Sequence, residues 1–239
     1  MDCPEQYAQV IIETPGMRPL DYLIPEGEMV AVGDRVIVPV QYQKKAGIVV
    51  AVRDWTEIAG RRLKKLARLL DGIPPLSSEW LGFTRFAAEY YCRSWGEVAL
   101  PAIPAFFRKR PGVRQAASLA KLRTLPDIKS SGKVDFNLLR LNPAQQQVVD
   151  QVIAAQDFVP WLLFGVTGSG KTEVYLHIMS KILEKDPESQ ILLLVPEINL
   201  TPQLEARVRG HFPRDRVVTL NSELSPAERA RAWLAIHEA

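Results

Sequence analysis

A glycine-rich stretch that ends in lysine and threonine, GVTGSGKT, is the part of the sequence best suited to chemistry. It matches the pattern G-x-x-x-x-G-K-[ST], in which a curled backbone presents successive N–H groups to phosphate oxygens. Lys171 is expected to reach the β- and γ-phosphates of a nucleotide, and the Thr172 hydroxyl is expected to ligate Mg²⁺. ATP with Mg²⁺ is therefore the expected ligand. The candidate nucleotide-binding residues in the stretch are Gly165, Val166, Thr167, Gly168, Ser169, Gly170, Lys171 and Thr172.

The segments around this loop predict how it is held. The apolar run 161–165 is typical of a short buried strand, and 171–185 of a helix whose positive N-terminal end faces the phosphates. This context favours a phosphate loop over a glycine-rich turn that matches by chance. Further buried strands are predicted at 191–197 and 216–220, with a helix between them. Another helix is predicted before the loop, with Asn142 as its N-cap and Pro143 at its first position. Strands that alternate with helices predict an α/β fold with a parallel sheet.

The first 70 residues have a different pattern. Apolar, β-branched runs at 7–14, 35–40 and 46–53 are separated by turn residues, which predicts a small β-barrel or a curled sheet. A helix is predicted over 77–92. Its aromatic residues recur at helical spacing, and we expect them to form a buried face rather than a surface on which bases stack. The residues of that predicted face are Trp80, Phe83, Phe86, Ala87 and Tyr90.

The charge of the chain is concentrated in its middle. Residues 101–140 carry nine basic and two acidic side chains, whereas the net charge of the whole chain is only +3. Four prolines in that segment make a long helix there improbable, so it is predicted to be a linker or a very small module. Arg108, Lys109, Arg110 and Arg114 are candidate contacts to a polyanion such as DNA, and a solvated linker is the alternative.

The composition excludes several classes of protein. Two cysteines, Cys3 and Cys92, are too few for a disulfide framework or a zinc site and fit a reducing cytoplasm. No apolar run reaches 18 residues, and the first residues lack the pattern of a signal peptide, so no membrane span is expected.

Several stretches resemble the primosomal protein N′ family, the replication-restart DNA helicases of superfamily 2. They are LNPAQQQVV, WLLFGVTGSGKTEVYL, LLLVPEINLTPQLEARVRGHF and SPAERARAWLA, together with PLDYLIPEG, GDRVIVPV and AGIVV near the start. The resemblance implies an OB-like 3′-DNA-binding domain at 1–100, a basic linker or reduced winged-helix region at 101–140, and a partial P-loop, RecA-like helicase lobe at 141–239. It also implies ATP-dependent 3′→5′ unwinding of DNA at stalled forks, and assembly of a primosome.

The resemblance also implies roles for single residues. Gln145 corresponds to the position that contacts adenine, although an exposed helical glutamine is the alternative. Thr201 and Gln203 correspond to the block that contacts the DNA backbone, or else cap a helix. Asp21 and Lys64 match a pocket for a 3′-terminal nucleotide, with Arg61 nearby; a capped turn and a solvated basic face are the alternatives. Two residues depart from that pocket: Leu20 stands for an aromatic residue and Gln41 for a glycine.

The pattern of the family is incomplete in these 239 residues. No D-E-E-H motif, zinc-binding cysteine cluster or second helicase lobe follows the loop. We therefore expect the front portion of such a helicase, which binds DNA forks, single strands, 3′ ends and ATP without turnover when alone. The family's other primosome proteins and single-strand-binding protein are the expected partners, zinc is expected only in the full-length family, and a nucleoid-associated cytoplasmic location follows. An unrelated P-loop NTPase with an OB-like accessory domain is the third hypothesis.

Overall fold

The chain forms two compact units in the computed structural model. Unit 1 combines residues 1–125 with 222–239, and unit 2 spans 126–221. Residues 222–239, expected to belong with 141–221, pack in unit 1. The structure describes residues 5–58, 63–69, 72–109, 115–124, 139–195, 201–212 and 217–238.

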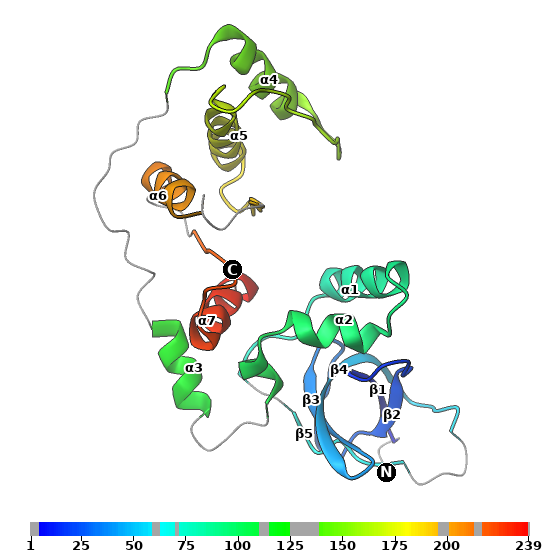
Figure 1. Ribbon diagram of the computed structural model, residues 1–239. Helices are drawn as coiled ribbons and strands as arrows, with labels where there is room; N and C mark the ends of the chain where they lie inside the picture. Colours follow the sequence, from blue (N-terminus) through cyan, green and yellow to red (C-terminus); the bar gives the residue numbers. More distant parts are fainter. Residues whose placement is uncertain are drawn as a thin grey trace. The chain divides into compact units, whose positions relative to one another are not determined.

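Unit 1 contains an antiparallel, five-stranded curled sheet with the strand order β2-β1-β4-β3-β5 (Figure 1). The predicted strands at 7–14, 35–40 and 46–53 are confirmed. A bulge between Gln9 and Val10 shifts the register of β1 against β4, which adds local twist to the curl. The strands are β1 (Tyr7–Ile12), β2 (Leu20–Leu23), β3 (Arg35–Val40), β4 (Gln43–Arg53) and β5 (Arg68–Leu69).

One short segment, residues 64–69, covers both edges of the curl. Its first half bonds to β2, where Leu23 N donates to Lys64 O at 3.0 Å and Leu66 N donates to Leu23 O at 3.1 Å. Its second half bonds to β3, where Ala67 N donates to Ile37 O at 2.9 Å before β5 pairs with the same strand. Edge strands expose unpaired backbone groups, so this segment removes much of that exposure.

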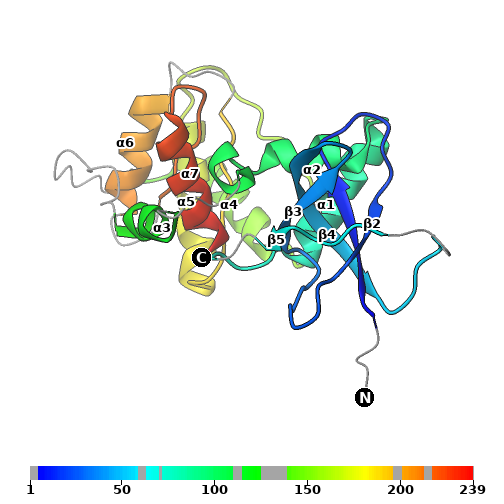
Figure 2. The ribbon, with the colours of Figure 1, turned by 90° about the horizontal axis from the view of Figure 1, so that it is seen from below.

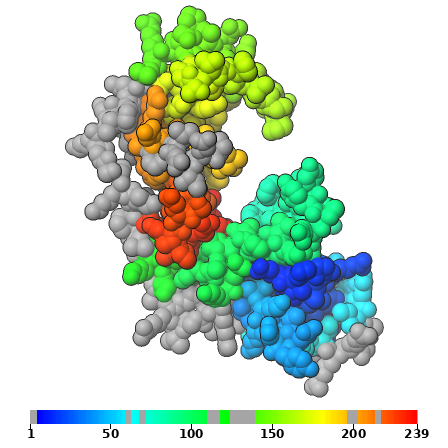
Figure 3. Space-filling view, viewed as in Figure 1, coloured from blue at the N-terminus to red at the C-terminus, as the bar shows by residue number. Residues whose placement is uncertain are grey.

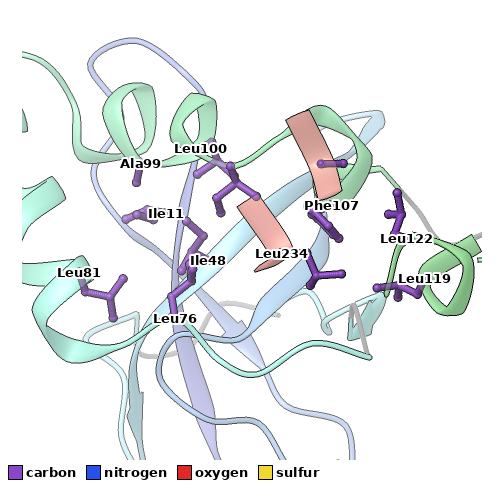
Figure 4. Packing of buried hydrophobic residues seen from close by; sticks show 12 residues of the cluster. Ile11, Ile48, Leu76, Leu81, Ala99, Leu100, Phe107, Leu119, Leu122 and Leu234 are labelled. Atoms are coloured by element: carbon purple, nitrogen blue, oxygen red, sulfur yellow. The ribbon is translucent and has the colours of Figure 1, made fainter. Parts of the chain in front are cut away.

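The two faces of the sheet belong to two apolar clusters. The inner face carries Val10, Val36, Val38 and Val49, each with no exposed surface. The outer face carries Ile11 and Ile48, which pack against helices (Figure 4). Alternate residues of a strand point to opposite faces, so neighbours such as Ile48 and Val49 enter different clusters. The sheet is thus buried on both sides where the helices cover it.

The helices of unit 1 come from distant parts of the chain. α3 and α7 lie side by side in both ribbon views (Figures 1 and 2). Leu119 and Leu122 of α3 share the outer cluster with Leu234 of α7, and Phe107 packs against Trp233 with ring centroids 4.9 Å apart and ring planes tilted by 39°. The helices are α1 (Ser78–Tyr90), α2 (Trp95–Ala102), the 3₁₀ helix η1 (Ala105–Arg108), α3 (Gln115–Thr124) and α7 (Pro226–His237).

The predicted buried face of α1 is wrong for three of its five residues, whereas Trp80 is partly buried against the outer cluster. Phe83, Phe86 and Tyr90 are 69%, 61% and 69% exposed, and α1 lies on the surface of unit 1 (Figure 3). The helix instead buries Leu81, Thr84 and Ala88. α1 packs against α2. Thr84 and Ala88 on the buried side of α1 are small, which lets the two helices approach closely. Thr84 Oγ1 accepts a hydrogen bond from Trp95 Nε1 at 3.1 Å, which ties the two helices together.

In its described residues, unit 2 contains the helices α4 (Pro143–Ala154), α5 (Lys171–Lys185) and α6 (Thr201–His211). α4 begins as predicted, with Asn142 as the N-cap and Pro143 in the first turn. The small apolar cluster of unit 2 joins Leu176 of α5 to Val208 and Phe212 at the end of α6. This cluster is the main apolar contact between α5 and α6.

The three predicted parallel strands of unit 2 are not seen in the residues that the structure describes. In the described parts of 161–165, 191–195 and 217–220 the backbone makes no strand pairing. A parallel strand needs a neighbour for its backbone groups and layers that cover both of its faces. Several apolar side chains of two of these segments stay in solvent, and the segment after α4 projects from the helices of unit 2 (Figures 1 and 3). Those at least three-quarters exposed are Leu162, Phe164, Leu192 and Leu194, and the nearby Phe158 and Val166 are equally exposed.

Among the helices within the described residues, none combines the length and the apolar composition that a bilayer crossing needs.

Candidate functional site

The glycine-rich loop leads directly into α5. Gly168 and Gly170 have φ angles of +82° and +81°, the left-handed region that residues with a Cβ adopt only with strain. A Cβ at Gly165 would lie 2.7 Å from Ser169 Oγ, so the loop closes tightly on itself. α5 starts at Lys171 and is 15 residues long, and the free N–H groups of its first turn favour an anion. These features fit a phosphate group at the loop.

Lys171 folds back onto the loop. Its Nζ donates to Gly165 O at 2.7 Å and to Val166 O at 2.9 Å. An ammonium group with three donors keeps one for a further acceptor in this arrangement. The loop carbonyls therefore hold the charge of Lys171 beside the backbone that would surround a phosphate.

Gln145 contacts the loop rather than standing free. Its Nε2 donates to Ser169 O at 3.1 Å, and its Oε1 accepts from Asn142 N at 3.0 Å. Asn142 Oδ1 in turn accepts from Gln145 N at 2.9 Å, which completes a capping box at the start of α4. The structure thus brings this predicted site residue to the predicted phosphate loop.

Glu173, next to Thr172, is buried with 7% of its surface exposed. It forms an ion pair with Arg207 of α6, and its Oε2 accepts from Leu139 N at 3.2 Å. His177 Nε2 lies 3.0 Å from Leu139 O, so a second side chain of α5 contacts the same residue. Removing one partner of a buried ion pair is costly, so Glu173 secures α6 and Leu139 to the helix that carries the loop.

In unit 1, Lys64 lies between β2 and the turn that joins β3 to β4. Its carbonyl accepts from Leu23 N, and its Nζ donates to Gln41 O at 3.1 Å. Gln41 has a φ of +51°, the left-handed region that glycine adopts without strain. The backbone therefore has at this position the conformation that a glycine would favour, although the residue is glutamine. Tyr42, the next residue, is fully exposed.

Asp21 lies on the outer side of β2. Its Oδ2 accepts from Thr56 Oγ1 at 2.6 Å, and its neighbours Leu20 and Tyr22 pack with the inner cluster. Burial raises the pKa of Tyr22 to about 12, and its hydroxyl donates to Pro39 O at 3.2 Å. Leu20 is therefore partly buried against the inner cluster and lacks the aromatic ring on which a base would stack.

The other residues predicted to contact DNA are spread over both units. Gln203 is exposed on α6, which begins at Thr201. Arg61 and the side chain of Thr201 lie outside the described residues. In the basic middle segment, Arg108 is engaged within unit 1: Nη1 pairs with Glu13 Oε2 at 2.7 Å, and Nε donates to Ile103 O at 2.9 Å. Arg110 and Arg114 also lie outside the described residues.

The sequence did not predict three polar contacts of the candidate sites. They join Asp21 to Thr56, Gln145 to Ser169, and Glu173 to Arg207. Only Glu173 carries a sequence signal, because an acid between Thr172 and the apolar residues of α5 falls on the buried side of that helix. In the described part of the chain, no three His, Cys, Asp or Glu side chains gather where they could hold a metal ion.

Two protein families match different parts of the chain. Residues 9–104 match the family described as 3′DNA-binding domain, which covers the curled sheet and helices α1 and α2. Residues 138–232 match the family described as type III restriction enzyme, res subunit, which covers the glycine-rich loop. The chain thus has a DNA-binding-domain match followed by a helicase-like match.

Several relatives of the chain are named replication restart protein PriA. The chain is 29% identical over 225 residues to replication restart protein PriA of Rickettsia felis, covering 93% of this chain and 31% of the relative. The identity to PriA of Haemophilus influenzae is 27% over 292 residues, covering 94% and 39%. With PriA of Synechocystis it is 41% over 126 residues, covering 52% and 14%. The chain thus spans about a third of the length of the first two. It is related to the PriA replication restart proteins and resembles their amino-terminal portion.

Proposed function

We propose that the chain is the amino-terminal portion of an ATP-dependent 3′→5′ DNA helicase that acts in replication restart. Unit 1 binds DNA, and unit 2 binds ATP with Mg²⁺ at the start of a P-loop, RecA-like lobe. The observation that carries the ATP assignment is the loop at 165–170, with two left-handed glycines directly before α5. The match of residues 9–104 to a 3′DNA-binding domain supports the DNA assignment.

The residues of unit 2 divide the work of holding a nucleotide. The backbone N–H groups of the loop and of the first turn of α5 donate to phosphate oxygens. Lys171 exchanges its bonds to Gly165 O and Val166 O for the β- and γ-phosphates. Thr172 ligates Mg²⁺, which neutralises phosphate charge when it is bound.

The substitution Lys171→Ala tests the ATP site. We expect it to weaken the binding of a fluorescent ATP analogue by at least about a hundredfold, because the charged hydrogen bonds to the phosphates are lost. Lys181→Ala on the same helix is the control, since Lys181 is half exposed and pairs only with Glu184 among the described residues. Unchanged affinity in the Lys171 variant would contradict the proposal.

On the DNA side, we propose that Asp21, Lys64 and Arg61 contact a 3′ end, and that Thr201 and Gln203 contact the DNA backbone. The position of Lys64 between β2 and the turn at Gln41 supports a contact at this end of the sheet. A carboxylate accepts from a sugar hydroxyl, and a lysine neutralises a phosphate. Forks and single strands with free 3′ ends are therefore the proposed DNA partners.

The 3′-end site is tested with oligonucleotides that end in a 3′-hydroxyl or a 3′-phosphate. We expect tighter binding of the 3′-hydroxyl strand, and we expect Asp21→Asn to reduce that preference. Lys44→Ala, in the nearby hairpin, is the control for a general loss of positive charge. Equal binding of the two oligonucleotides by the wild type would refute a pocket that reads the 3′ end.

A second candidate is a DNA- and nucleotide-binding module without turnover. It is favoured by Glu173, the acid closest in sequence to Thr172, which is buried and paired with Arg207. The chain alone is then expected to bind ATP without releasing phosphate. DNA-stimulated phosphate release by the purified chain would exclude this candidate and favour the helicase proposal.

The helicase proposal also predicts the surroundings of the protein. A cytoplasmic, nucleoid-associated location and contacts with other primosome proteins and with single-strand-binding protein follow from it. Zinc is expected only in the longer proteins of the family.

A further inference from the structure

We propose that Trp55 is the surface on which the base of a 3′-terminal nucleotide stacks, with Arg53 as the positioning residue behind its ring. The inference rests on the proposed 3′-end site of unit 1. It assigns the base to Trp55, whereas the proposed role of Asp21 concerns the sugar. The residue lies in the loop that follows β4, residues 54–58.

One hydroxyl group holds this loop against β2. Thr56 Oγ1 donates to Asp21 Oδ2 at 2.6 Å and accepts from Ile58 N at 3.2 Å. Within the described residues, the other carboxylate oxygen, Oδ1, makes no hydrogen bond, and it can accept from a sugar hydroxyl. Trp55 directly precedes Thr56 in the chain. A nucleotide whose sugar bonds to Asp21 therefore lies next to the loop that carries the indole.

The strand register brings Arg53 to the same face of the sheet as Asp21. Asp21 lies opposite Gln9 of β1, and Gln9 lies opposite Ala51 of β4. Residues that are opposite each other on neighbouring strands point to the same face, and so do residues two apart along one strand. Arg53 follows Ala51 by two positions and ends β4. The guanidinium and the carboxylate thus lie on one side of the sheet.

The ring of Trp55 is supported and still accessible. The guanidinium carbon of Arg53 lies over it, 4.9 Å from the ring centroid, and the residue is 51% exposed. A guanidinium stacked on one face of an indole leaves the other face for a base, and every base can stack on an aromatic ring. A ring that is already held loses little entropy when the base arrives. Trp55 thus supplies the aromatic surface that Leu20 lacks.

Tyr42 is the rival aromatic residue, because it follows Gln41, whose carbonyl accepts from Lys64. Tyr42 is fully exposed, so no neighbour covers or orients its ring. Stacking on such a ring costs the rotational freedom of the side chain. The held ring of Trp55 is therefore the better platform.

Stacking rather than charge is the expected source of affinity at Trp55. Its loop also carries Asp54 and Glu57, both exposed acids. Their charges oppose that of Arg53 toward an approaching phosphate, so this loop attracts a polyanion little. The contribution of Trp55 to binding is therefore expected to be independent of salt, unlike that of a phosphate contact.

The test removes the ring and the base separately and together. Fluorescence anisotropy measures binding of the full chain to a 5′-labelled single strand, and to the same strand without its 3′-terminal base. We expect the wild type to lose at least about fivefold in affinity when that base is missing. Trp55→Ala is expected to lose the same factor on the intact strand and nothing further on the strand without the base. The ratio between wild type and variant is expected to be equal at about 50 and 200 mM salt.

Three further variants sharpen the assignment. Trp55→Phe keeps a smaller ring and is expected to bind between the wild type and Trp55→Ala. Arg53→Lys keeps the charge but not the planar group, and is expected to lose about twofold on the intact strand alone. Tyr42→Ala is the control and is expected to stay within about twofold of the wild type.

Several results would overturn the proposal: unchanged affinity in Trp55→Ala, losses from ring and base that add, or a loss in Tyr42→Ala as large as that in Trp55→Ala. The 3′-end pocket fails separately. A wild type that binds 3′-hydroxyl and 3′-phosphate strands equally, yet loses affinity with the terminal base, would refute the role of Asp21 and support that of Trp55. A wild type indifferent to both the hydroxyl and the base would refute both.

Discussion

Unit 1 and unit 2 both contain short runs of apolar, strand-forming residues, but the side chains of these runs are buried in unit 1 and exposed in unit 2. In β3 of unit 1, Val36 and Val38 have no exposed surface. In unit 2, Leu192 and Leu194 belong to an equally apolar run and are 82% and 80% exposed. The difference is the presence of neighbours: β3 pairs with β4 and β5, whereas 191–195 pairs with nothing in the described residues.

The comparison separates two requirements for a strand. An apolar run supplies the tendency to be buried, but backbone pairing and a covering layer must come from other segments. In unit 1 these segments lie nearby in sequence, since β3 and β4 form a hairpin with a two-residue turn. A parallel arrangement needs partners from farther along the chain.

The largest expected difference between the units is in hydrogen exchange. Backbone amides of β3 and β4 are expected to exchange at least about a thousandfold more slowly than those of 162–164 and 192–194, because only the former are bonded and buried. Exchange mass spectrometry of the full chain measures both in one sample. Comparable protection in the two units would show that 162–164 and 192–194 are paired in solution.

Two glycines test how tightly unit 1 is packed. A Cβ at Gly96 of α2 would lie 1.9 Å from Ile12 O, so Gly96→Ala is expected to lower the free energy of unfolding by more than about 3 kcal/mol. Gly82 of α1 has no heavy atom within 4 Å of such a Cβ, and Gly82→Ala is expected to stabilise by about 1 kcal/mol. Thermal melts check both. A tolerated Gly96→Ala would mean that α2 does not lie against β1 at this distance.

Shortening one aliphatic side chain to alanine in each unit tests directly whether the two apolar runs differ in burial. Ile48 is fully buried, and Ile48→Ala is expected to cost about 3 kcal/mol of unfolding free energy. Leu194→Ala is expected to change stability by less than about 0.5 kcal/mol, because its side chain is 80% exposed. Denaturant titrations of the two variants give both values. A large loss in the Leu194 variant would indicate that this side chain is covered in solution.

The smallest effect is the pH dependence that Tyr22 gives to unit 1. Burial raises its pKa from 10.0 to about 12, so its contribution to stability is fully present below pH 10 and is lost as the pH rises toward 12. Relative to Tyr22→Phe, the wild type is expected to lose stability over that interval. Tyr175→Phe, at a 40% exposed side chain in unit 2, is the control. A constant difference between wild type and Tyr22→Phe would contradict the burial of the hydroxyl.

The parts of the fold that the sequence predicted correctly depend on near neighbours. The strands β1, β3 and β4 of unit 1, the cap at Asn142 and the start of α5 after the glycine-rich loop follow from local patterns, whereas β2 and β5 were not predicted. The exposed face of α1 could not be predicted, because Phe83, Phe86 and Tyr90 have the spacing of a core face. Which face is buried depends on how α2 packs against α1, where Trp95 bonds to Thr84.

The candidate sites show the same limit. The loop residues and Gln145 are found from motifs, but the partner of Gln145 is Ser169, 24 residues away. Asp21 and Thr56, and Glu173 and Arg207, are similarly paired across 34 or 35 residues. Such pairs arise from the packing of whole elements, which a single sequence does not reveal.

The position of α7 affects the order in which the protein is made. Ala230 and Leu234 complete the outer cluster of unit 1, yet about 100 residues of other sequence are synthesised between α3 and α7. At roughly 5–20 residues per second, the ribosome needs several seconds to deliver that part of the chain. During this interval the side chains of Phe107, Leu119 and Leu122 are not covered by α7. A nascent chain that is delayed there is the form most exposed to chaperones and to aggregation.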